Sequence, residues 1–273
     1  MIELSEPLKI KFNNLKSILI DKKVIVAFSG GVDSTLLGFI SKKFAEDTIL
    51  ITHKSVLYSD EELEQAREFA IENDIAHIII EGDPLENREF VSNPKNRCYI
   101  CKKDIFSKFI EVKIRKKFDI ITDGTNVDDL GDFRPGLDAL KELGIISPFI
   151  MADMNKDDIR NLSKYFNLNA HSKPSSACFA SRIPYNQKIT KEKLEMIKEA
   201  EMHVKNLLGV SQLRVRYHEE KLARVELLED DFSLLFKEEN RLNIIEKLKK
   251  IGFCYIAFDL EGFRSGSLNE VMD

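Results

Sequence analysis

The chain has 273 residues, 43% of them hydrophobic and 32% charged, with 41 Lys and Arg against 46 Asp and Glu for a net charge of −5. This composition is typical of a globular protein and excludes collagen-like, low-complexity and disordered architectures. The acidic balance gives no global electrostatic reason to expect a nucleic-acid partner, and four cysteines in this length exclude a disulfide scaffold. The start of the chain is acidic and polar, and no apolar run is long enough to span a bilayer. We therefore expect no membrane association and a cytoplasmic location.

The first half of the chain alternates short β-rich runs with helical patterns. Strands are expected at 24–28, 48–52, 75–80 and 119–122, with a fifth candidate at 145–149, and helices at 32–44, 59–72, 98–117 and 156–166. Strands that are apolar on both faces and spaced by helices predict a parallel sheet flanked by helices, an α/β fold. Ligands of such sheets bind at the carboxyl ends of the strands.

The pattern changes after an irregular, small-residue stretch. A helix at 191–208, strands at 212–217 and 223–228, a helix at 231–250 and a strand at 253–258 follow it. This order predicts a smaller α+β domain. We therefore expect a first domain over residues 1–168, a loop or linker over 169–188 and a second domain over 189–273.

A glycine loop, Ser29-Gly-Gly-Val-Asp-Ser34, lies between the first strand and the first helix. Glycine lets the backbone approach a ligand closely, and N–H groups at a helix N-terminus can hold phosphate oxygens together with serine hydroxyls. The loop matches neither the Walker nor the dinucleotide-binding pattern. The alternative is an ordinary strand–helix turn with a serine cap. Six such residues in this context favour a phosphate-binding loop.

The loop resembles the PP-loop of ATP pyrophosphatases, which split ATP into AMP and pyrophosphate while adenylating a substrate. This resemblance implies phosphate contacts from Ser29, Gly30, Gly31, Asp33 and Ser34. It also implies that Asp33 binds Mg²⁺ and that Ala27 and Thr52 border the adenosine. Magnesium is expected on physical grounds too, because crowded phosphates need countercharge for pyrophosphate to leave.

A second polar, glycine-rich cluster, residues 123–136, follows the strand at 119–122 and is expected on the same face as the glycine loop. Gly124 and Thr125 are candidate nucleotide contacts, and Asp128 or Asp129 could bind the metal. Arg134 could neutralise charge at the α-phosphate. The alternative is a solvated acidic loop with Arg134 in a surface ion pair.

The segment Ser172-Lys-Pro-Ser-Ser-Ala-Cys-Phe-Ala-Ser-Arg-Ile-Pro184 resembles the LarE group within the PP-loop enzymes. These are ATP-dependent sulfur transferases acting on pyridinium-3,5-biscarboxylic acid mononucleotide, on the path to a nickel-pincer nucleotide cofactor. The resemblance implies that a substrate carboxylate attacks ATP and that a sulfur nucleophile then displaces AMP. In single-cysteine members the residue matching Cys178 gives up its own sulfur and becomes dehydroalanine. The alternative for Cys178 is a small buried apolar side chain.

The chain departs from the single-cysteine pattern at Cys98-Tyr-Ile-Cys101. Such a pair can bind zinc, form a redox disulfide or hold two corners of an iron–sulfur cluster. Three-cysteine relatives imply that Cys98, Cys101 and Cys178 hold a [4Fe–4S] cluster with one open iron, which would make sulfur transfer catalytic. The alternative is two unlinked thiols at a helix start. We expect Cys254 to be buried in the core.

Arg214 and Arg216 alternate on a predicted strand, so both guanidinium groups face one side and suit a phosphate. The resemblance associates them with the phosphate of the mononucleotide, with Ser181 and Arg182 lining the same pocket. Glu226 on the neighbouring strand is a weaker candidate for this pocket. The alternative is an exposed face whose arginines pair with nearby glutamates.

Three other functions compete with a LarE-like sulfur transferase. A PP-loop tRNA thiolase uses similar chemistry, but the net charge of −5 and the lack of a basic appendage disfavour it. An amidating PP-loop enzyme gives no role to Cys98, Cys101 and Cys178 together. A nucleotide-binding sensor leaves the Cys178 segment unexplained. The expected partners are a small mononucleotide and a sulfide or sulfur donor, and the family suggests a homo-oligomer.

Overall fold

The computed structural model describes residues 4–131, 134–169, 177–264 and 266–270. The chain forms two compact units, one from Met1–Asp83 and Asn96–Ser176 and the other from Pro84–Lys95 and Ala177–Asp273. The sequence contained no sign that residues 84–95 belong with the second unit. The predicted boundaries of the first domain at residue 168 and of the linker at residue 188 stay predictions. Residues 170–176, which include the first part of the Cys178 segment, lie outside the described residues.

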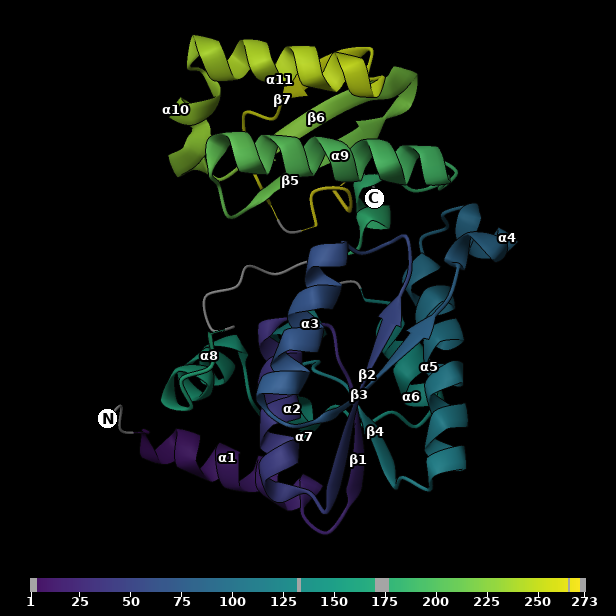
Figure 1. Ribbon diagram of the computed structural model, residues 1–273, viewed down its shortest axis with the longest axis vertical. Helices are drawn as coiled ribbons and strands as arrows, with labels where there is room; N and C mark the ends of the chain where they lie inside the picture. Colours follow the sequence, from purple (N-terminus) through teal and green to yellow (C-terminus); the bar gives the residue numbers. More distant parts are fainter. Residues whose placement is uncertain (1–3, 132–133, 170–176, 265, 271–273) are drawn as a thin grey trace. The chain divides into compact units, whose positions relative to one another are not determined.

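The first unit is built on a parallel sheet of order β3-β2-β1-β4 (Figure 1). Its strands are β1 (Lys23–Ala27), β2 (Asp47–Lys54), β3 (Ala76–Glu81) and β4 (Ile120–Thr122). Each neighbouring pair is parallel, and β1 lies centrally with partners on both edges. The continuous apolar runs are typical of strands covered on both faces. The predicted α/β fold class is therefore confirmed.

Helices cover both faces of this sheet (Figure 1). They are α1 (Glu6–Leu19), α2 (Val32–Phe44), α3 (Asp60–Glu72), α5 (Arg97–Lys116), α6 (Gly136–Glu142), α7 (Pro148–Met151) and α8 (Lys156–Tyr165). Capping boxes at Ser59 and Asn155 begin α3 and α8, since each side chain accepts a hydrogen bond from the third helical N–H. The 3₁₀ turn η2 (Val127–Gly131) follows β4.

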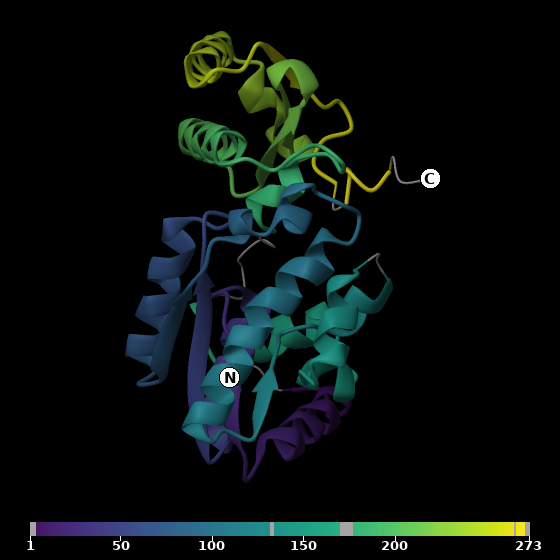
Figure 2. The same cartoon turned by 90° about the vertical axis from the view of Figure 1, so that its right-hand side faces the viewer.

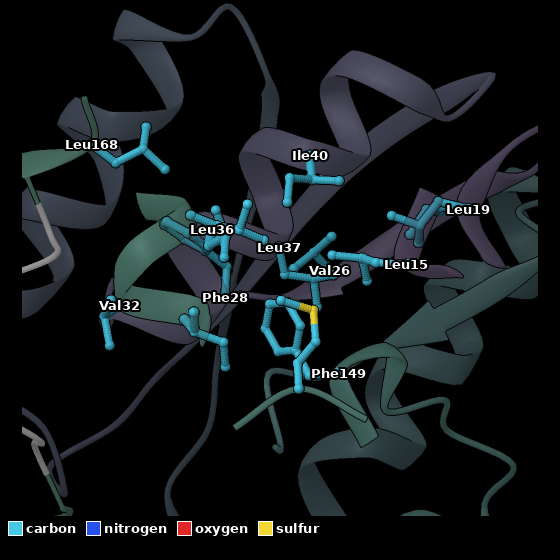
Figure 3. Close-up of a cluster of buried hydrophobic side chains, with 14 of the residues drawn as sticks. Leu15, Leu19, Val26, Phe28, Val32, Leu36, Leu37, Ile40, Phe149 and Leu168 are labelled. Atoms are coloured by element: carbon cyan, nitrogen blue, oxygen red, sulfur yellow. The ribbon is translucent and has the colours of Figure 1, made fainter. Parts of the chain in front are cut away.

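Two apolar cores lie on opposite faces of the sheet. One joins α1, α2, α7 and α8 to β1, and Figure 3 shows Leu37 and Phe149 beside Val26 there. The other packs α5 and α6 against the opposite face through residues such as Phe106. The two cores fix the carboxyl edge of the sheet, where the glycine loop follows β1.

The candidate strand at 145–149 is wrong. Ile146 makes an isolated parallel bridge to Thr122, and the short helix α7 begins at Pro148. Proline lacks the N–H group that would continue a strand ladder, and it is favoured in the first turn of a helix.

The second unit packs two long helices on one side of a three-stranded sheet (Figure 2). The sheet has the order β5 (Leu213–His218), β6 (Leu222–Leu227), β7 (Tyr255–Phe258), with β5–β6 antiparallel and β6–β7 parallel. The helices are α4 (Arg88–Val91), α9 (Lys191–Leu208), α10 (Phe232–Leu235) and α11 (Glu238–Ile251), with 3₁₀ turns η1 (Pro84–Glu86), η4 (Phe179–Arg182), η5 (Glu219–Lys221) and η6 (Glu229–Asp231). The predicted α-β-β-α-β order is present, with α4 added in front.

Two details of the second unit differ from expectation. The helix expected at 231–250 is interrupted, because Lys237 has an extended backbone and the ring of Phe236 packs edge-on against Phe258 at 5.5 Å. Cys254 is exposed and not buried in the core, since it lies just before β7 begins. Across the described parts of the chain, no helix combines the length and apolar character needed to cross a bilayer.

Candidate active site

The glycine loop forms a tight turn between β1 and α2. Gly30 has φ +72°, the left-handed region that favours glycine, and Gly31 is the N-cap of α2. The hydroxyls of Ser29 and Ser34 lie 3.2 Å apart, and the Ser34 hydroxyl donates to the Gly31 carbonyl at 3.2 Å. The first N–H groups of a helix have no partner within the helix, so this turn presents donors suited to an anion.

The loop after β4 lies directly against this turn. A Cβ placed on Gly124 would be 3.0 Å from the Cβ of Asp33 and 3.1 Å from the backbone nitrogen of Ser34. Only glycine therefore fits here without moving the first turn of α2. The expectation that the loop after β4 reaches the same face as the glycine loop is met at Gly124 by this close approach.

Asp33 is the centre of a charged group at this edge. Its carboxylate accepts from Lys156 Nζ at 2.5 Å and from Asn126 Nδ2 at 3.5 Å. Burial raises the pKa of Asp33 above the usual carboxyl value; Lys156 opposes this effect and the negative charge of Asp129 adds to it. Asp129 in turn forms a 2.7 Å ion pair with Arg134. Two carboxylates and two cations thus lie around the turn.

Other residues of the β4 loop bond to one another. Asp123 is buried, and it accepts from Thr125 Oγ1 and from Ser147 Oγ, the latter at 2.5 Å. Lys102 Nζ from α5 lies 3.8 Å from the same carboxylate. Asp128 accepts from the backbone nitrogen of Lys156 at 2.8 Å, which places it at the start of α8. Asp128 therefore accepts from the first N–H group of α8, while Asp129 lies on the Asp33 side.

The residues expected to border adenosine lie at the ends of β1 and β2. Ala27 is the last residue of β1 and is half-buried. Thr52 is buried, and its hydroxyl lies 2.7 Å from both the Phe28 carbonyl, to which it donates, and the His77 Nε2 atom. Burial lowers the pKa of His77, so a neutral ring lies beside this threonine.

The Cys-x-x-Cys pair opens α5. Cys98 is exposed and Cys101 half-buried, and the i, i+3 spacing places both on one side of the first turns of the helix. Thiolates spaced in this way suit a soft metal or an iron–sulfur cluster. Within residues 4–131, 134–169, 177–264 and 266–270, no three His, Cys, Asp or Glu side chains lie together in a group that could hold a metal ion. Cys98 and Cys101 belong to the first unit and Cys178 to the second.

Cys178 lies at the start of η4 and is half-buried. Its carbonyl oxygen accepts from the hydroxyl of Ser181 at 2.8 Å and from Arg182 Nη1 at 3.0 Å. Arg182 is also held in a two-point ion pair by Glu201 of α9, at 2.9 and 3.0 Å. The backbone at Cys178 is therefore fixed to α9 through one buried arginine.

A second buried ion pair lies on the β5–β6 sheet. Arg216 donates to Glu226 through Nε at 3.0 Å and Nη2 at 2.8 Å, and its Nη1 donates to the Ser181 carbonyl at 2.9 Å. Burial and the neighbouring charge of Arg182 lower the pKa of Arg214 to about 10. This arginine stacks over the ring of Phe263 at 5.2 Å. The expected arginines are thus buried and close together, and not on an exposed face.

Comparison with known proteins places these features in a family. No family model matches the chain. An uncharacterized protein of Synechocystis sp. is 34% identical over 267 residues, covering 97% of this chain and 99% of that protein. The pyridinium-3,5-bisthiocarboxylic acid mononucleotide synthase of Lactiplantibacillus plantarum is 32% identical over 256 residues, covering 92% of this chain and 90% of the synthase. The chain belongs to the LarE family.

A more distant similarity agrees with the fold of this LarE-family chain. The GMP synthase of Thermotoga petrophila is 23% identical over 215 residues, which is 70% of this chain and 42% of that enzyme. This similarity to part of a larger enzyme agrees with a PP-loop fold for this chain, as do its parallel sheet and its glycine loop.

Sequence reasoning missed three residues that contact candidate site residues within the two units of this LarE-family chain. Lys156 reaches Asp33 from 123 positions away, and no local motif marks it. Asn126 was within the quoted glycine-rich cluster but had no role assigned to it. Glu201 lies in a Lys/Glu-rich helix whose charges resemble a solvated face, and its contacts with Arg182 and with the backbone nitrogen of Val215 distinguish it.

Proposed function

We propose that this chain is an ATP-dependent sulfur transferase that converts a carboxylate of pyridinium-3,5-biscarboxylic acid mononucleotide into a thiocarboxylate for nickel-pincer cofactor synthesis. The observation that carries the proposal is the similarity to a named bisthiocarboxylic acid mononucleotide synthase over nearly the whole of both chains. Residues of the glycine loop would bind the ATP phosphates, and the Cys178 segment would take part in sulfur transfer.

The first step activates the carboxylate. A carboxylate oxygen attacks the α-phosphorus of ATP, the bond to the β-phosphate breaks, and pyrophosphate leaves with an acyl-adenylate remaining. Ser29, Gly30, Gly31 and Ser34 would bind the phosphates through N–H and hydroxyl groups. Asp33 and Asp129 would hold Mg²⁺, which supplies countercharge for the leaving pyrophosphate.

The paired charges around Asp33 suit this step. In the structure Lys156 bonds to Asp33 and Arg134 to Asp129. When Mg²⁺ engages the two carboxylates, both cations would be released toward phosphate oxygens, where a charged hydrogen bond is strong. Gly124 and Thr125, whose loop lies against the first turn of α2, would border the nucleotide.

The second step transfers sulfur. A sulfur nucleophile attacks the acyl carbon, the bond to AMP breaks, and the thiocarboxylate is formed. We propose that Cys98, Cys101 and Cys178 hold a [4Fe–4S] cluster, since three thiols are the donor set for such a cluster with one iron left without a protein ligand. When bound, the cluster would supply a place to hold the sulfide that is transferred. Cys178 would then remain intact through many turnovers.

The second unit would bind the mononucleotide phosphate. Arg182, Arg214 and Arg216 are buried together, and the first and third already pair with Glu201 and Glu226. Arg214 is held against the like charges of its neighbours, so an added phosphate would relieve repulsion there. Ser181, between Cys178 and Arg182, would place the phosphate close to the sulfur-bearing segment.

One preparation tests the whole proposal. The protein is purified without oxygen, its iron and visible spectrum are measured, and it is incubated with ATP, Mg²⁺, sulfide and the pyridinium dicarboxylate mononucleotide. We expect iron-dependent absorbance, AMP release that needs the mononucleotide, and a product heavier by the exchange of oxygen for sulfur. AMP release with tRNA and none with the mononucleotide would overturn the proposal. An iron-free protein whose Cys178 becomes dehydroalanine would remove the cluster and keep the transferase.

Replacing Lys156 with methionine should weaken catalysis and shift its pH dependence. Mg²⁺ needs the charged form of Asp33, so AMP formation falls as the pH drops through the raised pKa of this carboxyl group. Lys156 lowers this pKa, so its removal should move the acid limb of the kcat/KM profile to higher pH. Loss of a charged hydrogen bond, worth about 1.5–3 kcal/mol, should reduce kcat/KM for ATP roughly 10- to 100-fold at neutral pH.

A matched control for this variant is Lys11→Met. Lys11 pairs with Asp158 of the same helix α8 at 2.9 Å, and it does not bond to Asp33. It should leave both kcat/KM and the acid limb at their original values. An unchanged acid limb in Lys156→Met would contradict the assignment of Asp33 as a metal ligand.

A further inference from the structure

Two apolar rows of the first unit end in His53 and Gly82 at the carboxyl edge of the sheet. Because side chains alternate along a strand, His53 shares a face with Ile51 in β2, and Gly82 shares a face with Ile80 in β3. Ile51 belongs to the core beneath α5, and Ile80 packs against that core. The backbone nitrogen of Gly82 donates to the Lys54 carbonyl at 3.1 Å, which continues the pairing of the two strands. His53 and Gly82 therefore lie next to each other on the face that α5 covers.

Lys108 of α5 reaches the same place. A Cβ placed on Gly82 would be 2.6 Å from His53 Nε2 and 2.8 Å from Lys108 Nζ, so only glycine allows both nitrogens to approach the backbone here. Two nitrogens so close to one point are separated by less than two hydrogen-bond lengths. Within the described residues no hydrogen bond joins these two side chains directly. One oxygen atom of a ligand could therefore accept from both.

Both nitrogens are donors, and one of them is charged. Burial, and after it the charge of Lys108, lowers the pKa of His53 to about 4, while Asp104 opposes this effect, so the ring is neutral near pH 7. Its Nδ1 atom is buried and has no hydrogen-bond partner in the part of the chain that is described. An unpaired N–H is rarer inside proteins than an unpaired acceptor, so we assign the proton of the neutral ring to Nε2. An N–H group and an ammonium group thus converge beside Gly82.

Lys108 lacks a carboxylate partner among the residues that the structure describes. Asp104, one turn earlier on α5, influences His53 through its charge but forms no ion pair with Lys108. Glu81, next to Gly82 in the sequence, pairs with Lys54 at 2.7 Å instead. A half-buried ammonium group without a carboxylate, beside a neutral imidazole that donates, suits an anionic oxygen from a ligand.

The place beside Gly82 lies along the helix that carries the Cys-x-x-Cys pair. Lys108 follows Cys101 by seven residues, which is close to two helical turns, so both residues lie on one side of α5, about 10 Å apart along its axis. The carboxyl ends of β2 and β3 form the edge at which ligands of parallel sheets bind. A ligand anchored beside Gly82 would therefore lie along the side of α5 that bears the Cys101 thiol.

We propose that His53 Nε2 and Lys108 Nζ, brought together beside Gly82, form an oxyanion site that binds a carboxylate of the substrate. The identity of the ligand rests on the proposed function, in which the substrate carries two carboxylates and ATP activates one of them. The second carboxylate stays charged during that step, and two convergent donors would bind it and orient the ring that carries both groups. The site lies wholly within the first unit.

The test uses the full chain labelled with ¹⁵N-histidine and pyridine-3,5-dicarboxylate as the probe. Two-dimensional NMR follows the imidazole resonances, and the resonance of His53 is identified by its loss in His53→Gln. We expect the probe to shift this resonance with saturation. Gly82→Ala places a methyl group against both nitrogens, and Lys108→Met removes the ammonium group and keeps the stem. Each variant should weaken probe binding by about tenfold or more, the loss expected for a charged hydrogen bond.

Lys116→Met is the matched control for these variants. Lys116 is exposed in the last turn of the same helix, so its loss should leave probe binding and turnover as in the parent. Circular dichroism checks that each variant is folded. In turnover assays, Gly82→Ala and Lys108→Met should raise KM for the mononucleotide and leave KM for ATP unchanged. A His53 resonance that responds to ATP or inorganic phosphate and not to the dicarboxylate would overturn the inference, as would parental probe binding in Gly82→Ala.

The site and the proposed function fail in different ways. Saturating binding of the dicarboxylate at His53 in a protein that forms no thiocarboxylate would remove the proposed function and leave the carboxylate site standing. Thiocarboxylate formation with an unchanged KM for the mononucleotide in both Gly82→Ala and Lys108→Met would remove the site and keep the function.

Discussion

Replacing Cys178 with alanine should abolish thiocarboxylate formation while pyrophosphate release by the adenylation step continues. The proposed adenylation residues, centred on Asp33 and the glycine loop, lie in the first unit and do not include this cysteine. Loss of the sulfur-bearing group should lower product formation by at least about 10³-fold, the scale expected when an essential nucleophilic group is removed. The measurement is a pair of assays on one sample, pyrophosphate release and product mass.

Two further cysteine variants sharpen this prediction. Cys98→Ala should permit at most one product per chain, because without the cluster Cys178 could supply only its own sulfur. Cys254→Ala should behave as the parent, since this exposed cysteine precedes β7 and has no assigned role. Repeated turnover by Cys98→Ala would contradict the cluster. Full loss of pyrophosphate release in Cys178→Ala would show that Cys178 is needed before sulfur transfer.

Replacing Glu226 with alanine should destabilise the second unit strongly. Glu226 is fully buried and accepts hydrogen bonds from Arg216, from Arg224 at 3.0 Å and from the Ser267 hydroxyl at 2.8 Å. Its removal leaves a buried guanidinium without its carboxylate, which typically costs about 3–5 kcal/mol. The measurement is the free energy of unfolding in urea, followed by circular dichroism.

An exposed ion pair provides the matched control. Glu199 and Lys247 join α9 to α11 in the same unit at 2.6 Å, with side-chain exposures of 47% and 33%. Because water screens such a pair, Glu199→Ala should change the free energy of unfolding by about 0–1 kcal/mol. A loss below about 1 kcal/mol in Glu226→Ala would mean that Arg216 finds another partner when this carboxylate is removed.

The predictable parts of the site are those whose partners are close in sequence. Ser29–Ser34 form a turn because two glycines lie directly between a strand and a helix. The glycines, the strand and the helix can all be recognised in the sequence. The same holds for Ser59, whose capping box with Glu62 needs only three residues. The helix predicted at 231–250 is longer than either helix found there, because the chain breaks at Lys237. This break accompanies the packing of Phe236 on Phe258, a residue of a strand further along the chain.

Family membership and the identity of the three thiols did not need coordinates, since they rest on the order of residues along the chain. Composition, apolar periodicity and the glycine loop were enough to predict the α/β fold class. The sequence alone thus determined the glycine loop and the three thiols to which the proposed phosphate binding and sulfur transfer are assigned.

Tertiary structure alone decided how these groups are paired. Lys156 bonds to Asp33, Glu226 to Arg216, and Asn93 to Ile183 only after folding has brought these residues together from separate parts of the sequence. Side chains at such distances have no periodicity or spacing that links them, so nothing local distinguishes them from solvated charges or an ordinary turn residue. Burial makes the pairing obligatory, because an unpaired charge or amide inside the fold is costly.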